Sequence, residues 1–273
     1  MTSQPLSLVF LPGAGNHPPD LGLFKSEVIE FVVPLSYPNW QRFTSERLSA
    51  NDLVRDLAAQ VRTNVPEGPV CIVGHSLGGH LGYAIGLQLQ AEGREIAGFC
   101  AIDSFMVSSV VPHKDWKQKA VTRAWELLKG RRFSELALFF REKFWRLAIR
   151  LFVERRPHMM KRMSGGGKGA PADRVLDNEL SMRILLREMA PWIGSLDENP
   201  RPLEVPSLLL RTGETVGNDK AWKLRCPGIQ IHEVPGHHHS LFDSENVREL
   251  QTAFHEAAAC WSAARFASYE SHR

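Results

Sequence analysis

A short apolar run that stops at a serine enclosed by glycines constrains the fold of this chain more than any other feature. Residues 70–73 read VCIV, and residues 74–79, GHSLGG, follow directly. Such an unbroken apolar run is typical of a strand covered on both faces, as in a parallel sheet. A buried strand with an ordinary glycine turn would account for these residues. The pattern G-x-S-x-G between a strand and a helix is also typical of a strained turn that leaves no room for side chains beside the serine and exposes its hydroxyl.

Apolar strands and helices alternate on both sides of this motif. Strand patterns cover residues 6–11, 29–34, 70–73, 96–102, 205–211 and 229–234, and helix patterns cover residues 53–65, 77–90 and 244–263. Glycines at helical spacing in the second of these helices would let it lie close to a sheet. The alternation predicts a mostly parallel sheet connected by crossover helices.

The alternation is interrupted for about a hundred residues. Helix patterns at residues 114–129, 134–155 and 173–192 surround a glycine-rich loop at residues 163–171. A chain of 273 residues can form one large α/β domain or two small ones. The interruption favours one α/β domain, with its core in residues 1–104 and 204–273 and a helical insertion at 105–203.

Composition excludes few classes of protein. The hydrophobic fraction is 43%, the charged fraction 23% and the formal net charge +3, as in ordinary soluble proteins. No apolar stretch approaches the roughly 20 residues of a membrane span, and no signal peptide is visible, so we expect a cytoplasmic protein. The four cysteines lack metal-ligand spacing, and we expect Cys71 and Cys100 to be buried thiols.

A serine hydroxyl becomes a nucleophile only when a base takes its proton. Residues 234–242, VPGHHHSLF, follow the last predicted strand and supply three adjacent histidines. A metal site is disfavoured because consecutive side chains point apart and no acidic or cysteine partner has regular spacing. The carboxylate that would orient the base is Asp103, at the end of one strand, or Glu214 or Asp219, which follow the next strand, and sequence order permits each.

Three stretches together resemble a known family: VFLPGAGN, the long segment from EGPVCIVGHSLGG to FCAIDS, and VPGHHHSLF. They are similar to the thioesterase domains that end fatty-acid, polyketide and nonribosomal-peptide assembly lines, and to their free-standing relatives. The resemblance covers roughly residues 6–104 and 205–260. It implies an α/β-hydrolase fold, a mostly parallel sheet with helices on both faces, in which residues 105–203 form a large helical lid.

The resemblance also assigns roles to particular residues. It implies that Ser76 is the nucleophile and that the acid is Asp103 rather than Glu214, because the family carries its acid on the strand after the nucleophile helix. The family's histidine pattern, laid on residues 236–242, selects His238.

The same family stabilises the oxyanion with two backbone amides. The resemblance implies Leu77 and, after the proline of the first strand, Gly13, with Ala14 as the alternative. One departure is that residues 80–86, HLGYAIG, lack the bulky apolar residue and the glutamate that the family often carries there.

The resemblance implies a serine thioesterase that releases an acyl, polyketide or peptidyl chain from a carrier-protein or CoA thioester through an acyl-Ser76 intermediate, without metal or organic cofactor. No carrier domain precedes the first strand, so we expect action on a separate carrier. Alternatives are an acyltransferase or cyclase that passes the chain to an alcohol or amine, a carboxylesterase, and a non-enzymatic carrier-binding protein with a vestigial motif.

Positive charge is concentrated in the predicted insertion. Residues 114–162 hold 15 Lys and Arg against 5 Asp and Glu. This segment is a solvated lid surface, or a docking surface for an acidic acyl or peptidyl carrier protein, whose encounter opposite charges would speed. Nucleic acid or an anionic membrane is a third possibility, and no nucleic-acid motif supports it.

Overall fold

The computed structural model describes residues 5–105, 125, 129 and 171–271. Its contacts divide the chain into two units, residues 1–106 with 185–273, and residues 107–184. The sheet and the candidate site lie in the first unit. The helices predicted at 114–129 and 134–155, the loop at 163–171 and the basic segment 114–162 fall almost entirely outside the described residues.

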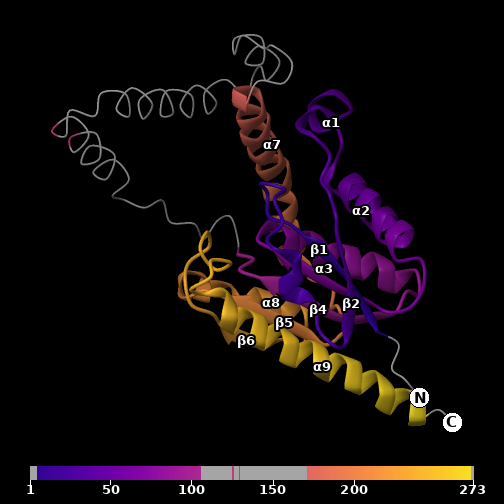
Figure 1. Cartoon of the computed structure of the whole chain (residues 1–273). Coiled ribbons are helices and arrows are strands. Elements are labelled where there is room, and N and C mark those ends of the chain that lie inside the picture. Colours follow the sequence, from indigo (N-terminus) through magenta and orange to yellow (C-terminus); the bar gives the residue numbers. More distant parts are fainter. Residues whose placement is uncertain (1–4, 106–124, 126–128, 130–170, 272–273) are drawn as a thin grey trace. The chain divides into compact units, whose positions relative to one another are not determined.

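Six strands form one sheet in the order β2-β1-β3-β4-β5-β6, and every neighbouring pair is parallel (Figure 1). The predicted parallel α/β sheet is therefore confirmed. The strands are β1 (Leu6–Leu11), β2 (Ile29–Pro34), β3 (Val70–His75), β4 (Ile96–Ile102), β5 (Ser207–Arg211) and β6 (Gln230–Glu233).

The position of each strand in the sheet explains its composition. Strands β3 and β4 lie at the centre, and nearly every residue in them is buried. Most residues of the edge strands β2 and β6 are half-buried or exposed, so their sequences include Glu30, His232 and Glu233. A strand covered on both faces needs apolar side chains at every position, whereas an edge strand does not.

The described helices are α1 (Trp40–Ser45), α2 (Ala50–Asn64), α3 (Leu77–Ala91), α7 (Pro171–Glu198), α8 (Asp219–Arg225) and α9 (Val247–Ser271), with 3-10 turns η1 (Leu21–Phe24) and η3 (Gly213–Asn218). The helix predicted at 173–192 is longer in the structure and continues through Pro191. Within the described part of the chain, no helix has the length and apolar character needed to cross a membrane.

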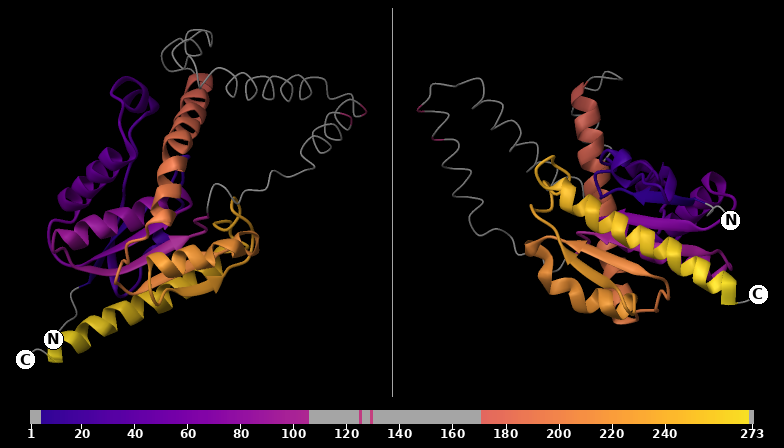
Figure 2. Two further views of the ribbon diagram at one scale, coloured as in Figure 1. Left: turned by 180° about the vertical axis from the view of Figure 1, so that it is seen from behind. Right: turned by 60° about the horizontal axis from the view of Figure 1, so that its bottom comes forward.

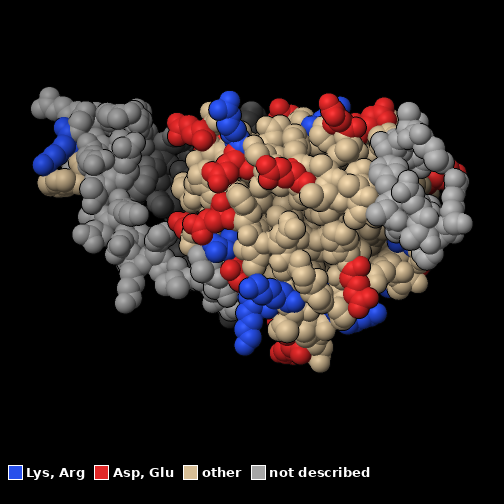
Figure 3. Space-filling model, turned by 90° about the horizontal axis from the view of Figure 1, so that it is seen from below, with Lys and Arg blue, Asp and Glu red and all other residues tan. Residues whose placement is uncertain are grey.

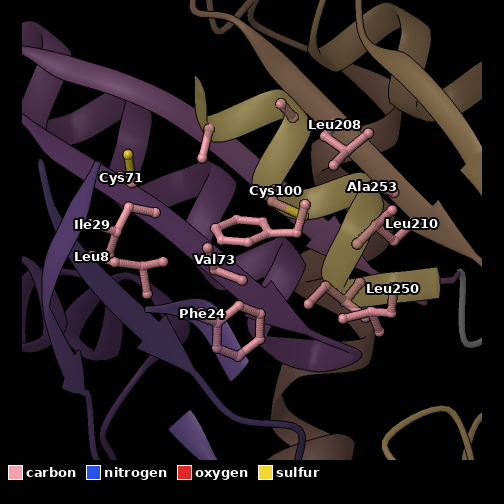
Figure 4. Close-up of a cluster of buried hydrophobic side chains, with 14 of the residues drawn as sticks. Leu8, Phe24, Ile29, Cys71, Val73, Cys100, Leu208, Leu210, Leu250 and Ala253 are labelled. Carbon is pink, nitrogen blue, oxygen red and sulfur yellow. The ribbon is translucent and has the colours of Figure 1, made fainter. Parts of the chain in front are cut away.

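Helices cover both faces of the sheet. Helix α9 lies along one face (Figure 2), where Phe254 and Trp261 belong to the same buried cluster as Cys71 and Val73 of β3. Leu250 and Ala253 of α9 join Leu210 in this cluster (Figure 4). Because successive side chains of a strand point to opposite faces, Ile72 faces the other side, where helix α3 packs.

Glycines bring both covering helices close to the central strands. A Cβ added to Gly82 of α3 would lie 3.1 Å from Ile72, and one added to Gly98 of β4 would lie 2.1 Å from the Trp261 ring of α9. The predicted close approach of the glycine-rich helix to the sheet is confirmed. Because neighbouring strands are parallel, the carboxyl ends of β1, β3, β4 and β5 lie at one edge of the sheet, where the candidate site also lies.

Candidate active site

Ser76 lies in a sharp turn between β3 and α3. Its backbone has φ 55° and ψ −120°, and residues other than glycine rarely adopt a positive φ. The Ser76 amide donates a hydrogen bond of 2.8 Å to the carbonyl of Ile102 at the end of β4, which holds the turn against the neighbouring strand. Backbone conformations of this kind typically cost about 1–3 kcal/mol and persist only where the surroundings enforce them.

The flanking glycines are sterically required. A Cβ on Gly74 would lie 2.1 Å from the carbonyl oxygen of Gly78, and a Cβ on Gly78 would lie 2.2 Å from that of Leu11. A Cβ on Gly79 would lie 2.0 Å from Oγ of Ser104. The motif is thus a turn that admits no side chain on these three residues, as the G-x-S-x-G pattern predicts, and an ordinary glycine turn does not describe it.

Asp103 and His238 are joined at the same edge of the sheet. Asp103 follows β4 with φ 44°, its amide donates to the carbonyl of Leu210 at 2.7 Å, and its Oδ2 lies 2.7 Å from Nδ1 of His238. Oδ1 of Asp103 accepts hydrogen bonds from the amide of Thr212 at 2.9 Å, its hydroxyl at 3.0 Å and the hydroxyl of Thr215 at 2.8 Å.

The hydrogen bonds decide the charge of this carboxyl. Burial of Asp103 raises its pKa, but the hydrogen bonds from His238, Thr212 and Thr215 outweigh burial and lower the pKa to about 2. An ionised carboxylate only accepts hydrogen bonds, so Nδ1 of His238 carries the proton and Nε2 is left as the acceptor. This is the tautomer that a general base requires.

The alternative acids and histidines lie elsewhere. Glu214 is exposed in η3, and Asp219 forms an ion pair of 3.0 Å with Arg211. His237 and His239 are exposed, whereas the His238 side chain is only 18% exposed. The structure therefore brings Asp103 to His238 and to neither of its neighbours. Among the described residues, no group of three His, Cys, Asp or Glu side chains could hold a metal ion.

Aromatic rings pack against the His238 imidazole. The His75 ring stacks on it with centroids 5.0 Å apart, and the Phe105 ring meets it edge-on at 4.8 Å. Phe242 in turn packs edge-on against His75 at 5.0 Å. Burial, and then the positive charge of His238, lower the pKa of His75 to about 3, so this neighbour is neutral when His238 takes up a proton.

The loop after β1 reaches the serine turn. A Cβ on Gly13 would lie 3.4 Å from Cβ of Ser76 and 3.3 Å from Nδ1 of His75. Leu77 is the first residue of α3, and the first amides of a helix have no partner within it. Within the described part of the chain, neither Gly13 nor Ala14 donates a backbone hydrogen bond. The loop after β1 and the start of α3 thus both bring unpaired amides next to Ser76.

Buried polar side chains hold the segment that follows Asp103. The indole of Trp222 donates to the carbonyl of Ser104 at 2.7 Å, and Nε2 of His80 lies 3.2 Å from the carbonyl of Phe105. Arg225, which is 1% exposed, lies 2.7 Å from Nδ1 of His80. Because a guanidinium only donates, Nδ1 accepts and Nε2–H of His80 donates to Phe105.

Arg225 has further partners in this cluster. It forms an ion pair of 2.5 Å with Asp197 and lies over the rings of Tyr83 and Trp222, at 5.3 Å and 5.2 Å. His80 and Tyr83 stand at the place where the sequence departs from the thioesterase pattern. The positions at which the sequence departs from the pattern are therefore part of a buried polar cluster.

Several residues of this site carry no signal in the sequence. Thr212, Thr215 and Phe105 contact Asp103 or His238 without belonging to any recognisable spacing. Only the position of Thr212, directly after a predicted strand, could have suggested it. Cys71 and Cys100 are buried, as predicted.

The fold and the strained serine turn define an α/β hydrolase, and the comparisons with known proteins agree. Residues 8–250 match the model described as the alpha/beta hydrolase family, so the chain belongs to that family. No curated protein matches the sequence. The predicted α/β-hydrolase fold is confirmed.

Solved structures of thioesterase domains share this fold. The Vlm2 thioesterase domain is 17% identical, with a TM-score of 0.56 over 90% of this chain and 92% of its own. The NocB thioesterase domain is 20% identical, with a TM-score of 0.58 over 93% and 95%. The RedJ thioesterase of Streptomyces coelicolor is 18% identical, with a TM-score of 0.55 over 93% and 86%.

Proposed function

We propose that this α/β hydrolase is a serine thioesterase, with Ser76 as nucleophile, His238 as base and Asp103 as the acid that orients the base. The observation that carries the proposal is the 2.7 Å contact of Asp103 with Nδ1 of His238, at the same sheet edge as the strained Ser76 turn. It supplies a base with a free Nε2 and a fixed ring orientation, which is what activation of a serine hydroxyl requires.

In the first half of the reaction, Nε2 of His238 takes the hydroxyl proton as Oγ of Ser76 attacks the thioester carbonyl. The amides of Leu77 and Gly13 stabilise the resulting oxyanion, and each such donor typically contributes about 3 kcal/mol. The carbon–sulfur bond then breaks, and His238 returns its proton to the leaving thiolate. The product is an acyl ester on Ser76 and a free thiol.

In the second half, His238 takes a proton from water as its oxygen attacks the acyl ester. The ester carbon–oxygen bond then breaks, His238 gives the proton to Oγ of Ser76, and the acid is released. Asp103 stays ionised throughout, because its hydrogen bonds hold its pKa near 2. Attack by an alcohol or amine in place of water would make the same residues an acyltransferase or cyclase, which is the second candidate.

The substrate class rests on the sequence resemblance and on what similar folds bind. Structures of the Vlm2 domain hold a dodecadepsipeptide, and the NocB domain was captured in a covalent complex with a fluorophosphonate nocardicin G analog. RedJ is described as the thioesterase of a prodiginine biosynthetic pathway. We accordingly propose an acyl, polyketide or peptidyl thioester on a carrier protein or CoA, met in the cytoplasm.

The carrier contact is proposed from sequence alone. The basic segment 114–162 remains the candidate docking surface, and it lies almost entirely outside the described residues. On the face of the described residues that Figure 3 displays, acidic and basic side chains are interspersed. That face presents mixed charge to a partner, so a strongly acidic carrier has no electrostatic reason to prefer it.

Intact-protein mass spectrometry tests the proposal. Wild-type protein should be labelled by a fluorophosphonate and should turn over acyl-pantetheine thioesters. Ser76→Ala should lose both, whereas Ser195→Ala, which removes an exposed serine of α7, should retain both.

The acyl donors and acceptors separate the alternatives. Turnover of oxygen esters but not thioesters would make the protein a carboxylesterase. A stable acyl-enzyme released only by alcohols or amines would make it a transferase. A wild-type protein without label or turnover would contradict catalysis altogether and favour a carrier-binding role.

A further inference from the structure

Tyr37 lies beside the loop that reaches Ser76, although it is far from the serine in sequence. It follows the edge strand β2, whose last residue, Pro34, pairs with Phe10 of β1. The next amide, of Leu35, donates to the carbonyl of Phe10 at 2.8 Å. This pairing brings Tyr37 to the carboxyl end of β1, where residues 12–16 form the loop next to the serine turn.

Tyr37 holds this loop at two points. Its hydroxyl donates to the carbonyl of Pro12 at 2.5 Å, and its amide donates to Oδ1 of Asn16 at 3.2 Å. Asn16 closes the loop, because its amide donates to the carbonyl of Gly13 at 2.9 Å while its own backbone has φ 56°. Both ends of the loop therefore depend on Tyr37.

The contact with Pro12 sets the direction of the amide of Gly13. The chain has no cis peptide bonds, and in a planar trans peptide the C=O and N–H of one unit point in opposite directions. Because Tyr37 holds the Pro12 carbonyl, the amide of Gly13 points away from Tyr37. Gly13 lies next to Ser76, because a Cβ built on it would lie 3.4 Å from Cβ of the serine.

The same reasoning applies to the next peptide. The carbonyl of Gly13 is occupied by the amide of Asn16, so the amide of Ala14 is turned the opposite way. Asn16 in turn is held by Tyr37. Tyr37 thus controls the orientation of both candidate oxyanion donors, Gly13 and Ala14, whichever of them meets the oxyanion.

Burial keeps the Tyr37 hydroxyl a donor. The side chain is 7% exposed, and burial raises its pKa well above the ordinary value for tyrosine. The phenol is therefore protonated at neutral pH. A hydrogen bond to a carbonyl also polarises the peptide unit, which strengthens the N–H at its other end as a donor.

We propose that Tyr37 is a positioning residue of the oxyanion hole, which orients and polarises the peptide between Pro12 and Gly13 and anchors the loop through Asn16. This inference rests on the proposed serine hydrolase function. Because Tyr37 does not touch the substrate, its loss should change the rate of acylation and not the binding of substrate.

Tyr37→Phe tests the proposal, because it retains the ring and removes only the hydroxyl. Acylation of Ser76 by an acyl-pantetheine should slow by about ten-fold while KM stays near the wild-type value, since oxyanion stabilisation acts in the transition state. Affinity for a trifluoromethyl ketone, which forms a tetrahedral adduct with the serine, should fall in parallel.

Tyr83→Phe is the matched control. The Tyr83 hydroxyl also donates to a backbone carbonyl, that of Arg201, and its loss leaves the ring contacts in place. Both variants should lower the melting temperature, but Tyr83→Phe should acylate at the wild-type rate. A purely structural role of Tyr37 would make the two variants alike and would overturn the proposal.

Asn16→Gly covers the case in which Tyr37→Phe does not fold. Glycine accepts the positive φ of an exposed residue and removes only the side chain that Tyr37 holds. Slower acylation at unchanged KM would support the proposal, and a wild-type rate would contradict it. An inert wild-type protein would instead overturn the proposed function together with this inference, so the two failures are distinguishable.

Discussion

Nδ1 of His238 lies 2.7 Å from Oδ2 of Asp103, although 135 positions separate the two residues in the chain. The contact joins the loop after β6 to the end of β4, across the intervening strand β5. Oδ1 of the same carboxyl is occupied by Thr212 and Thr215, which leaves Oδ2 directed at the imidazole. The orientation of His238 is therefore set by residues of three segments.

Asp103→Asn should reduce turnover strongly and leave the fold intact. An amide cannot stabilise an imidazolium, and its NH₂ group favours the wrong tautomer of His238, so we expect a loss of roughly 10³–10⁴-fold in kcat. Asp219→Asn is the matched control, because Asp219 pairs with Arg211 and not with a histidine. Steady-state kinetics on a thioester measure both, and comparable activity in Asp103→Asn and wild type would return the acid to Glu214 or Asp219.

Gly79→Ala should destabilise the protein. The added Cβ would lie 2.0 Å from Oγ of Ser104, so the start of α3 or the segment after β4 must move, and overpacking of this kind typically costs about 1–3 kcal/mol. Gly194→Ala, in α7, is the control, because among the described residues no atom lies within 4 Å of its built Cβ. Urea unfolding should show a loss for Gly79→Ala and no loss for Gly194→Ala, and equal stabilities would contradict the steric argument.

Arg225→Met should cost far more stability than the loss of a surface arginine. Arg225 is 1% exposed, and its removal leaves His80 and Asp197 without their donor, for which about 3–5 kcal/mol is typical. Arg62→Met removes an ion pair with Glu92 whose side chains are 45% and 39% exposed, and such pairs contribute about 0–1 kcal/mol. Chemical denaturation of the two variants measures the difference in free energy of unfolding. Similar losses would show that the buried cluster stabilises the fold no more than the surface ion pair does.

Acid should destabilise the fold through His80. Burial, and then the charge of Arg225, lower the pKa of His80 to about 3, whereas an unfolded histidine has a pKa of about 6.5. Below about pH 6.5 the unfolded chain binds a proton that the native state does not, so stability is full above that pH and falls by about 1.4 kcal/mol per pH unit as the pH drops toward 3.

The comparison of wild type with His80→Gln isolates the contribution of His80 to the pH dependence of stability. Between pH 6 and pH 4, urea unfolding of the wild type should lose stability more steeply than the variant, by about 1.4 kcal/mol per pH unit. Asp103, whose pKa is lowered to about 2, contributes above its unfolded pKa and is lost only at lower pH, outside this window. Parallel slopes in the two proteins would show that His80 takes up a proton without unfolding.

The sequence alone determined the parts of this protein that depend on neighbours in the chain. The apolar run 70–73, the glycines around Ser76 and the strand–helix alternation are local patterns. Sterics and periodicity translate such patterns directly into a strand, a strained turn and a parallel sheet. Contacts between distant residues are not local patterns, so the sequence could select His238 only through a family pattern. From the residues alone, Asp103, Glu214 and Asp219 all remained candidates for the acid.

Tertiary structure decided which distant residues meet. Whether Asp103, Glu214 or Asp219 lies against His238 depends on the order of β4, β5 and β6 in the sheet, and no local pattern encodes that order. Tyr37 reaches Pro12 only because β2 pairs with β1. These contacts between segments far apart in the chain depend on how the strands pair and the helices pack, and that becomes definite only when the whole core is assembled.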